Sequence, residues 1–182
     1  MTAPLATAAD VVAFWREAGP ARWYRKDDDF DREFRDRFLA THEAAARGDL
    51  DGWLATAQGA LALCILLDQF PRNAFRGSAR MFATDAKARE VARSALGSQF
   101  DQQVDGELRQ FFIMPAMHSE DRADQELCVS LASALPTDTL RWAVLHQDII
   151  ERFGRFPHRN GLLGRASTEE ERRFLDEGGF SG

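Results

Sequence analysis

Residues 59–73 read GALALCILLDQFPRN, and this stretch decides the fold. Apolar side chains fill nearly every position of residues 59–67, so they would encircle a helix instead of lining one face of it. A helix that is apolar all round is buried on all sides. The run is too short to cross a membrane, which takes roughly 20 apolar residues. We therefore expect a central helix, capped by Asp51 and limited by Pro71, inside an all-α fold.

The rest of the chain follows the same helical spacing, and no convincing alternation of period two is present. No Pro/Ser-rich linker or shift in composition divides the chain, and no fixed repeat period is legible. The sequence therefore predicts one all-α domain over residues 1–182, a bundle of about eight helices. Besides the central helix, helices are expected over about residues 8–18, from 27–29 to 48, and over 84–97, 105–113, 119–135, 139–153 and 167 onward.

Small polar residues mark several of the expected helix starts. Thr84 and Ser119 are expected to act as N-caps, and Ser167 with Glu170 matches the spacing of a capping box. The helix after Ser119 should turn its apolar residues inward and end before a proline. Those residues are Leu127, Cys128, Leu131 and Leu135, and the proline is Pro136.

Composition excludes several classes of protein. The 182 residues carry a formal net charge of -6, which disfavours nonspecific binding of nucleic acid. No basic residue precedes Arg16, so a signal peptide is not predicted and a cytoplasmic location, away from membranes, is expected. Cys64 and Cys128 lie singly in apolar patterns, which predicts reduced thiols that pack in the core.

The common catalytic and metal-binding motifs are missing. The sequence contains no Glu-x-x-His pair, no HExxH, no HxH, no GxxxxGK and no G-x-S-x-G. Di-iron bundles, zinc proteases, P-loop proteins and hydrolases with a nucleophile elbow therefore lack motif support, and no cofactor or metal is predicted.

The first of three unusual polar segments is residues 67–77, LDQFPRNAFRG. It places Asp68, Arg72 and Asn73 at the end of the most apolar helix, where they are candidate ligand-binding residues. The alternative is a plain helix stop, in which Arg72 pairs with Asp68 and Asn73 serves a turn.

The second segment is residues 111–125, FFIMPAMHSEDRADQ. His118, Ser119 and Glu120 lie at an expected helix N-terminus, where free N–H groups favour an anionic ligand. The same environment lowers the pKa of a nearby histidine and favours its neutral form, which suits a general base. The alternative is that Ser119 caps the helix, Glu120 complements its dipole, and His118 is a surface turn residue.

The third segment is residues 151–167, ERFGRFPHRNGLLGRAS. Residues 151–165, here called the basic island, contain four arginines and one glutamate, a local charge of +3. Arginine near apolar surface holds carboxylate or phosphate in a planar fork. The candidates are Arg155, Arg159, His158 and Asn160. Alternatively, the arginines pair with Asp68, Glu120 and other acids and fasten a long loop onto the bundle.

Other histidines and aromatic residues have structural interpretations. His146 shares a helical stripe with Trp142 and Phe153, so it faces the core or the wall of a pocket. His42 receives no functional interpretation. The N-terminal aromatic group is expected to pack in the core, and it consists of Trp15, Trp23 and Tyr24.

Four motifs together carry a family resemblance. They are LDQFPRN at residues 67–73, MFATD at 81–85, HSE at 118–120 and RFGRFPHRN at 152–160. With them the chain resembles, over nearly its whole length, the bacterial family of unknown function numbered 924 among the domains of unknown function. The resemblance implies a soluble bacterial protein with an all-helical, tetratricopeptide-like fold. It implies no reaction and no set of catalytic residues.

Three functional hypotheses follow, and the sequence decides neither enzymatic activity nor oligomeric state. The first is a protein that binds a small anionic or polar molecule, with acid–base catalysis as its enzymatic form. The second is a helical module whose arginines bind an acidic peptide or protein. The third is a metal site built from His118, Glu120, His146 or His158, which the spacing disfavours. In the first hypothesis the catalytic candidates are His118, Glu120 and His158, and the ligand-binding candidates are Asp68, Arg72, Asn73, Ser119, Arg155, Arg159 and Asn160.

Overall fold

The computed structural model describes residues 5–135 and 138–182, and all regular structure within these residues is helical, as predicted. Several predicted boundaries hold closely, among them residues 8–18 and 139–153. The α-helices are α1 Ala8–Ala18, α2 Pro20–Trp23, α3 Asp28–Arg47, α4 Ala57–Cys64, α5 Phe70–Ala74, α6 Asp85–Gly97, α7 Met114–Met117, α8 Arg122–Ala132, α9 Thr139–Phe153 and α10 Glu169–Asp176. Short 3₁₀ turns occupy Asp51–Ala55, Ala79–Phe82, Phe100–Gln103, Leu108–Phe112 and Pro157–Arg159.

The predicted central helix is α4 with its continuation. Every side chain from Ala60 to Leu67 is at most 1% exposed, and α4 packs against α1 and α6. Phe30, Phe34 and Phe38 recur every fourth residue of α3 and meet Phe14 of α1 in one aromatic cluster. Burying each such side chain contributes about 1.5–3 kcal/mol, so this cluster anchors the N-terminal half of the molecule.

The prediction that Pro71 ends this helix is wrong. A π-helical turn, Ile65–Gln69, continues α4 and leads directly into α5, which contains Pro71. Proline has no N–H to donate to the preceding turn, so backbone carbonyls there need other donors. His42 donates to the carbonyl of Leu66 at 2.8 Å and Thr84 to that of Leu67 at 2.6 Å. These side chains allow the chain to stay helical through the proline.

Several predicted caps are also corrected. Thr56, rather than Asp51, caps α4, because the 3₁₀ turn intervenes. Asp121, rather than Ser119, caps α8 by accepting from the N–H of Ala123. Thr84 is the N-cap residue of α6, as predicted, but its hydroxyl donates to the carbonyl of Leu67 and makes no capping hydrogen bond to the helix. The last capping box is one residue later than predicted, with Thr168 and Glu171.

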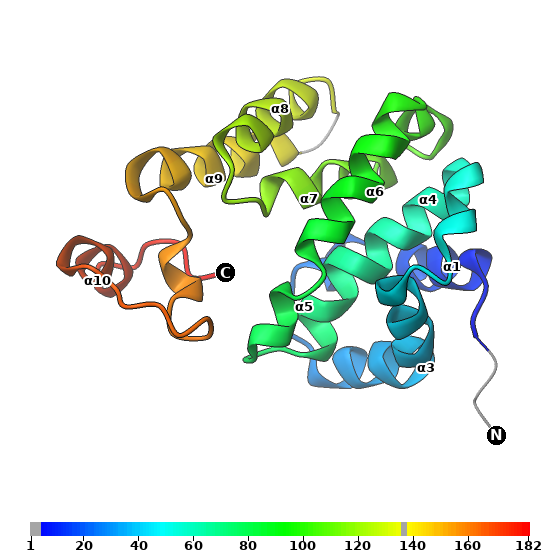
Figure 1. The fold of residues 1–182 in the computed structure, drawn as a ribbon, viewed down its shortest axis with the longest axis horizontal. Helices are drawn as coiled ribbons and strands as arrows, with labels where there is room; N and C mark the ends of the chain where they lie inside the picture. The colour runs from blue at the N-terminus through cyan, green and yellow to red at the C-terminus, as the bar shows by residue number, and fades with distance from the viewer. Residues whose placement is uncertain (1–4, 136–137) are drawn as a thin grey trace.

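The second half of the molecule is built on α8 and α9, which pack side by side and enclose a smaller core with α7. Figure 1 shows this pair on the other side of α5 and α6 from α1 and α3. Leu127 of α8 is 38% exposed, so its predicted inward position is wrong, and Pro136 lies outside the described residues. The described helices include none that is long and apolar enough to span a membrane.

Candidate functional site

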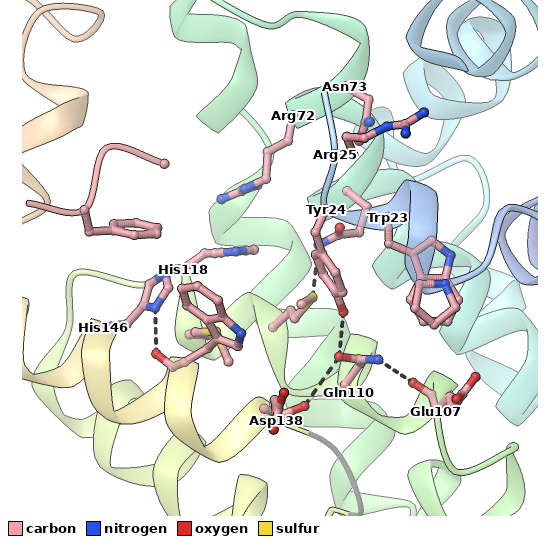
Figure 2. A pocket seen from close by; sticks show the side chains of 18 of the residues that line it. Trp23, Tyr24, Arg25, Arg72, Asn73, Glu107, Gln110, His118, Asp138 and His146 are labelled. Carbon is pink, nitrogen blue, oxygen red and sulfur yellow. Dashed lines mark hydrogen bonds between the residues drawn. The ribbon is translucent and has the colours of Figure 1, made fainter. Parts of the chain in front are cut away.

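A cleft of about 570 Å³ lies where α2 and α5 face α7, α9 and the residues after α10. Its polar wall includes Gln69, Arg72, His118 and His146, and its apolar wall includes Trp23, Tyr24, Met114, Trp142 and Phe180. Figure 2 shows the side chains of Trp23, Tyr24, Arg72, His118 and His146 gathered from segments far apart in the sequence. The volume is in the range of clefts that take a small organic ligand.

The polar wall is organised by one buried carboxylate, that of Asp68. It is 1% exposed, and both of its oxygens contact Nδ1 of His118, at 2.8 and 3.0 Å. Gln69 donates to it at 2.6 Å, and Arg72 lies 3.3 Å away. Burial alone would raise the pKa of Asp68, but Arg72 and then His118 outweigh burial and hold that pKa well below its usual range. Asp68 is therefore a carboxylate at neutral pH.

The carboxylate fixes the tautomer of His118. An ionised carboxylate only accepts hydrogen bonds, so Nδ1 of His118 carries the proton and Nε2 keeps its lone pair. Burial, and then the positive charge of Arg72, lowers the pKa of His118, although Asp68 acts in the opposite direction. The imidazole is thus neutral near pH 7. Because the ring lines the cleft, its second nitrogen is placed for proton transfer.

Two arginines share a second carboxylate behind this pair. Arg72 holds Asp85 through two bonds of 2.9 and 3.1 Å, and Arg159 lies 3.5 Å from the same group. Arg159 also donates to the backbone carbonyl of His118 at 2.9 Å. Burial, followed by Arg72, lowers the pKa of Arg159 to about 10. Arg159 thus positions the backbone that carries His118.

His146 of α9 forms the facing wall. Its Nδ1 donates to the carbonyl of Trp142 at 2.8 Å, and its ring centre lies 6.2 Å from that of His118. Burial, and then His118, lowers the pKa of His146 to about 4, so this ring is neutral as well. Of the two environments that the sequence allowed for His146, it occupies a pocket wall. Trp142 also lines the cleft and is 45% exposed.

Other predicted site residues lie outside the walls of the cleft and make structural contacts. Glu120 accepts from both terminal nitrogens of Arg165, at 2.8 and 2.9 Å, and from the N–H of Phe156 at 2.8 Å. Ser119 donates to Asp124 of α8 at 2.7 Å. Both residues therefore join the start of α8 to its neighbours.

The remaining candidates hold the C-terminal loop. Arg155 binds Glu171 through bonds of 2.6 and 2.8 Å and, as the largest cause, lowers the pKa of that carboxyl to about 2. Asn160 donates to the same carboxylate at 3.2 Å. His158 is packed against Phe180, with ring centres 5.2 Å apart, and burial followed by Arg159 lowers its pKa to about 3.

Asn73 does line the cleft, but its amide donates to Asp31 of α3 at 2.7 Å.

All four arginines of the basic island have an acidic partner. The pairs are Arg152 with Glu170, Arg155 with Glu171, Arg159 with Asp85 and Arg165 with Glu120. This arrangement matches the structural alternative given for residues 151–167, in which the arginines fasten a long loop onto the bundle. Asp85, however, takes the place of Asp68 as an acidic partner.

Sequence reasoning missed three contributors to the site. Asp85 stood in the MFATD motif but resembled an ordinary acidic residue in the first turn of a helix. Gln69 adjoins Asp68 and received no role. Tyr24 is the third contributor. Its predicted place in the core is wrong, because it is 58% exposed and donates to Gln110 at 2.6 Å. Trp15 and Trp23 are buried, as predicted. Within the described part of the chain, no group of three or more His, Cys, Asp or Glu residues could hold a metal ion.

Residues 11–179 match the model of a family described as bacterial protein of unknown function (DUF924). The chain belongs to this family. It is also similar to a solved structure of a protein of unknown function, ATU0120, from Agrobacterium tumefaciens. The two share 54% sequence identity and superpose with a TM-score of 0.92, over 94% of this chain and 97% of the other. No curated protein is significantly similar to this DUF924 member in sequence.

Proposed function

We propose that this DUF924 member binds a small polar molecule in the cleft and transfers a proton to or from it through His118. The observation that carries the proposal is the contact between the buried carboxylate of Asp68 and Nδ1 of His118. A carboxylate in this position orients an imidazole and stabilises its charged form, which makes Nε2 an effective general base.

The proton would pass from the bound molecule, or from a water beside it, to Nε2 of His118. The resulting imidazolium would be stabilised by Asp68, and the same nitrogen could return the proton in a later step. A positioned acid–base group contributes roughly 10²–10⁴-fold to a rate. Neither cysteine lines the cleft, and burial raises the pKa of Cys128 to about 12. The residues therefore favour proton transfer over attack by a thiolate.

The competing hypothesis of an acidic-peptide module has less support. It relies on arginines that are free to bind carboxylates of a partner. Each arginine of the basic island instead lies within 3.5 Å of an acidic group of the same chain. A peptide would have to break these pairs, so the cleft is the stronger candidate site.

A thermal-shift screen of small polar metabolites tests the proposal. Compounds that raise the Tm of the wild-type protein should lose most of this effect with His118→Gln and Asp68→Asn. They should keep it with Arg152→Ala, which removes an exposed arginine that does not line the cleft. The proposal is overturned if every stabilising compound acts equally on wild type and His118→Gln. It is also overturned if ¹⁵N NMR at pH 7 finds the proton of His118 on Nε2.

A further inference from the structure

The two histidines of the cleft offer the same chemical group. Nδ1 of His118 is bound to Asp68 and Nδ1 of His146 to the carbonyl of Trp142, so each ring keeps an Nε2 lone pair. Within the described residues, neither Nε2 has a hydrogen-bond partner, and both rings line one cleft with centres 6.2 Å apart. Two acceptors side by side call for a ligand that donates two hydrogen bonds.

A third acceptor adjoins them. The side-chain nitrogen of Gln69 donates to Asp68 at 2.6 Å and to the sulfur of Met114 at 3.3 Å. This orientation is set by chemistry, because a carboxylate accepts only from the nitrogen end of an amide. The carbonyl oxygen of Gln69 is thus left without a donor among the described residues. It belongs to the same wall of the cleft.

The charged side chains around the acceptors of His118, His146 and Gln69 balance one another. Arg72 and Arg159 are offset by Asp68 and Asp85, all within one network of contacts. An anionic group would have to compete with both aspartates for the guanidinium groups. An ammonium group would lie close to Arg72, whose charge already lowers the pKa of His118. The head group that fits best is therefore an uncharged donor, such as a hydroxyl.

The other half of the cleft is suited to an apolar body. Trp23, Tyr24 and Trp142 present aromatic rings, and Met114 and Phe180 add apolar surface. Tyr24 and Trp142 are 58% and 45% exposed, so large ring surfaces are left uncovered at this site. Aromatic side chains in such positions commonly stack on a flat or alicyclic ligand.

We propose that the ligand of this cleft has an aromatic or alicyclic body and two neighbouring uncharged hydroxyl groups, one donating to His118 and one to His146. A single hydroxyl has one proton and can satisfy only one of the two nitrogens, which is why a pair is required. His118 then accepts the hydrogen bond of one hydroxyl at Nε2, while His146 is a positioning residue that holds the second. This inference rests on the proposed function of His118.

A matched series of four phenyl compounds tests the head group: 1-phenyl-1,2-ethanediol, 2-phenylethanol, phenylacetate and 2-phenylethylammonium. Their Kd values, and the imidazole ¹⁵N shifts of both histidines, are measured by NMR titration at pH 7.5. We expect the diol to bind about fivefold more tightly than the mono-alcohol, the value of one added hydrogen bond. We expect both charged compounds to bind more weakly still. The diol should shift Nε2 of His118 and of His146.

Three variants separate the parts of the proposal. His146→Phe keeps an aromatic ring beside Phe156 and Phe180, and it should remove the fivefold preference for the diol. Trp142→Ala should weaken the binding of all four compounds alike. Leu140→Ala, at an exposed position of the same helix that does not line the cleft, should change nothing. If His146→Phe does not fold, the ¹⁵N shift of His146 in the wild-type protein decides the point.

Tighter binding of phenylacetate than of the diol would overturn the proposed head group and leave the acid–base function of His118 standing. Failure of all four compounds to shift either histidine would overturn the proposed ligand class. A separate result, a proton on Nε2 of His118 in the ligand-free protein, would overturn the proposed acid–base function of this residue.

Discussion

The carboxylate of Asp68 lies 2.8 Å from Nδ1 of His118, although fifty positions separate the two residues in the chain. Asp68 belongs to the π-helical turn that prolongs the central helix, and His118 follows α7. The pair therefore joins the N-terminal aromatic core to the α8–α9 half of the molecule. It serves the fold and the cleft at once, because the same contact buries the charge and fixes the imidazole.

Asp68→Asn should destabilise the protein by roughly 3–5 kcal/mol, because it removes one of the two carboxylates that balance Arg72 and Arg159 and leaves Asp85 to balance both. Urea unfolding at pH 7.5 measures the change. The exposed pair of Arg152 and Glu170 provides the control, since Arg152→Ala should cost less than 1 kcal/mol. Equal losses for both variants would mean that Asp68 contributes no more than a surface charge.

Stability should fall as the pH drops from 6.5 toward 4. His146 and His158 have folded-state pKa values of about 4 and about 3, below the ordinary value of 6.5. Between those values the unfolded chain binds protons that the folded chain excludes, so acid favours unfolding. Their contribution is fully present above pH 6.5. The groups that face them are chiefly His118, Arg72 and Arg159, which disfavour added positive charge.

Urea unfolding at pH 7.5, 6 and 5 measures this slope. One unit of pKa difference corresponds to about 1.4 kcal/mol, so the loss by pH 5 should be of the order of a few kcal/mol. His158→Phe should flatten the profile, because it removes one of the two histidines whose pKa values are lowered to about 4 and about 3. A stability that is constant from pH 7.5 to 5 would contradict the burial of neutral imidazoles in the folded protein.

The helical class of the fold was predictable because the apolar period is local information. Residues 59–67 are apolar on every side, and a buried central helix, inside a chain whose other apolar residues follow helical spacing, satisfies that pattern. The path through Pro71 was not predictable in the same way. It depends on His42 and Thr84, which supply hydrogen-bond donors from α3 and from the start of α6. No local pattern states that these residues lie beside residues 66 and 67.

The site was predictable only in its residue types. The sequence predicts site roles for Asp68, Arg72 and His118 because they are polar residues beside apolar helix ends, and the structure brings them together. Arg155, His158 and Asn160 looked similar in the sequence but lie outside the walls of the cleft. The difference is tertiary, because Glu171 of α10 binds Arg155 and Asn160, and no spacing rule relates these segments.

Thr84→Val tests whether the hydrogen bond from Thr84 stabilises the helical backbone that precedes Pro71. The substitution keeps the shape of the side chain but removes the hydroxyl that bonds the carbonyl of Leu67 at 2.6 Å. An unpaired buried carbonyl should cost about 1–3 kcal/mol of unfolding free energy. Thr84→Ser keeps a hydroxyl and should cost clearly less. If the serine variant loses as much stability as the valine variant, the methyl group matters and the hydrogen bond does not.

Glu120→Ala should loosen the C-terminal loop before it unfolds the rest of the protein. Glu120 accepts from Arg165 and from the N–H of Phe156, so its loss leaves that backbone donor unpaired and removes the acidic partner of Arg165 where the loop meets α8. Both side chains of the ion pair are partly exposed, so solvent screens it and the local cost should be about 1–2 kcal/mol. Hydrogen exchange should then accelerate about tenfold in residues 154–180, with little change in α4. Arg173→Ala, which removes an exposed pair with Glu169, serves as the control. Acceleration that is uniform over the whole chain would show that the loop unfolds only together with the core.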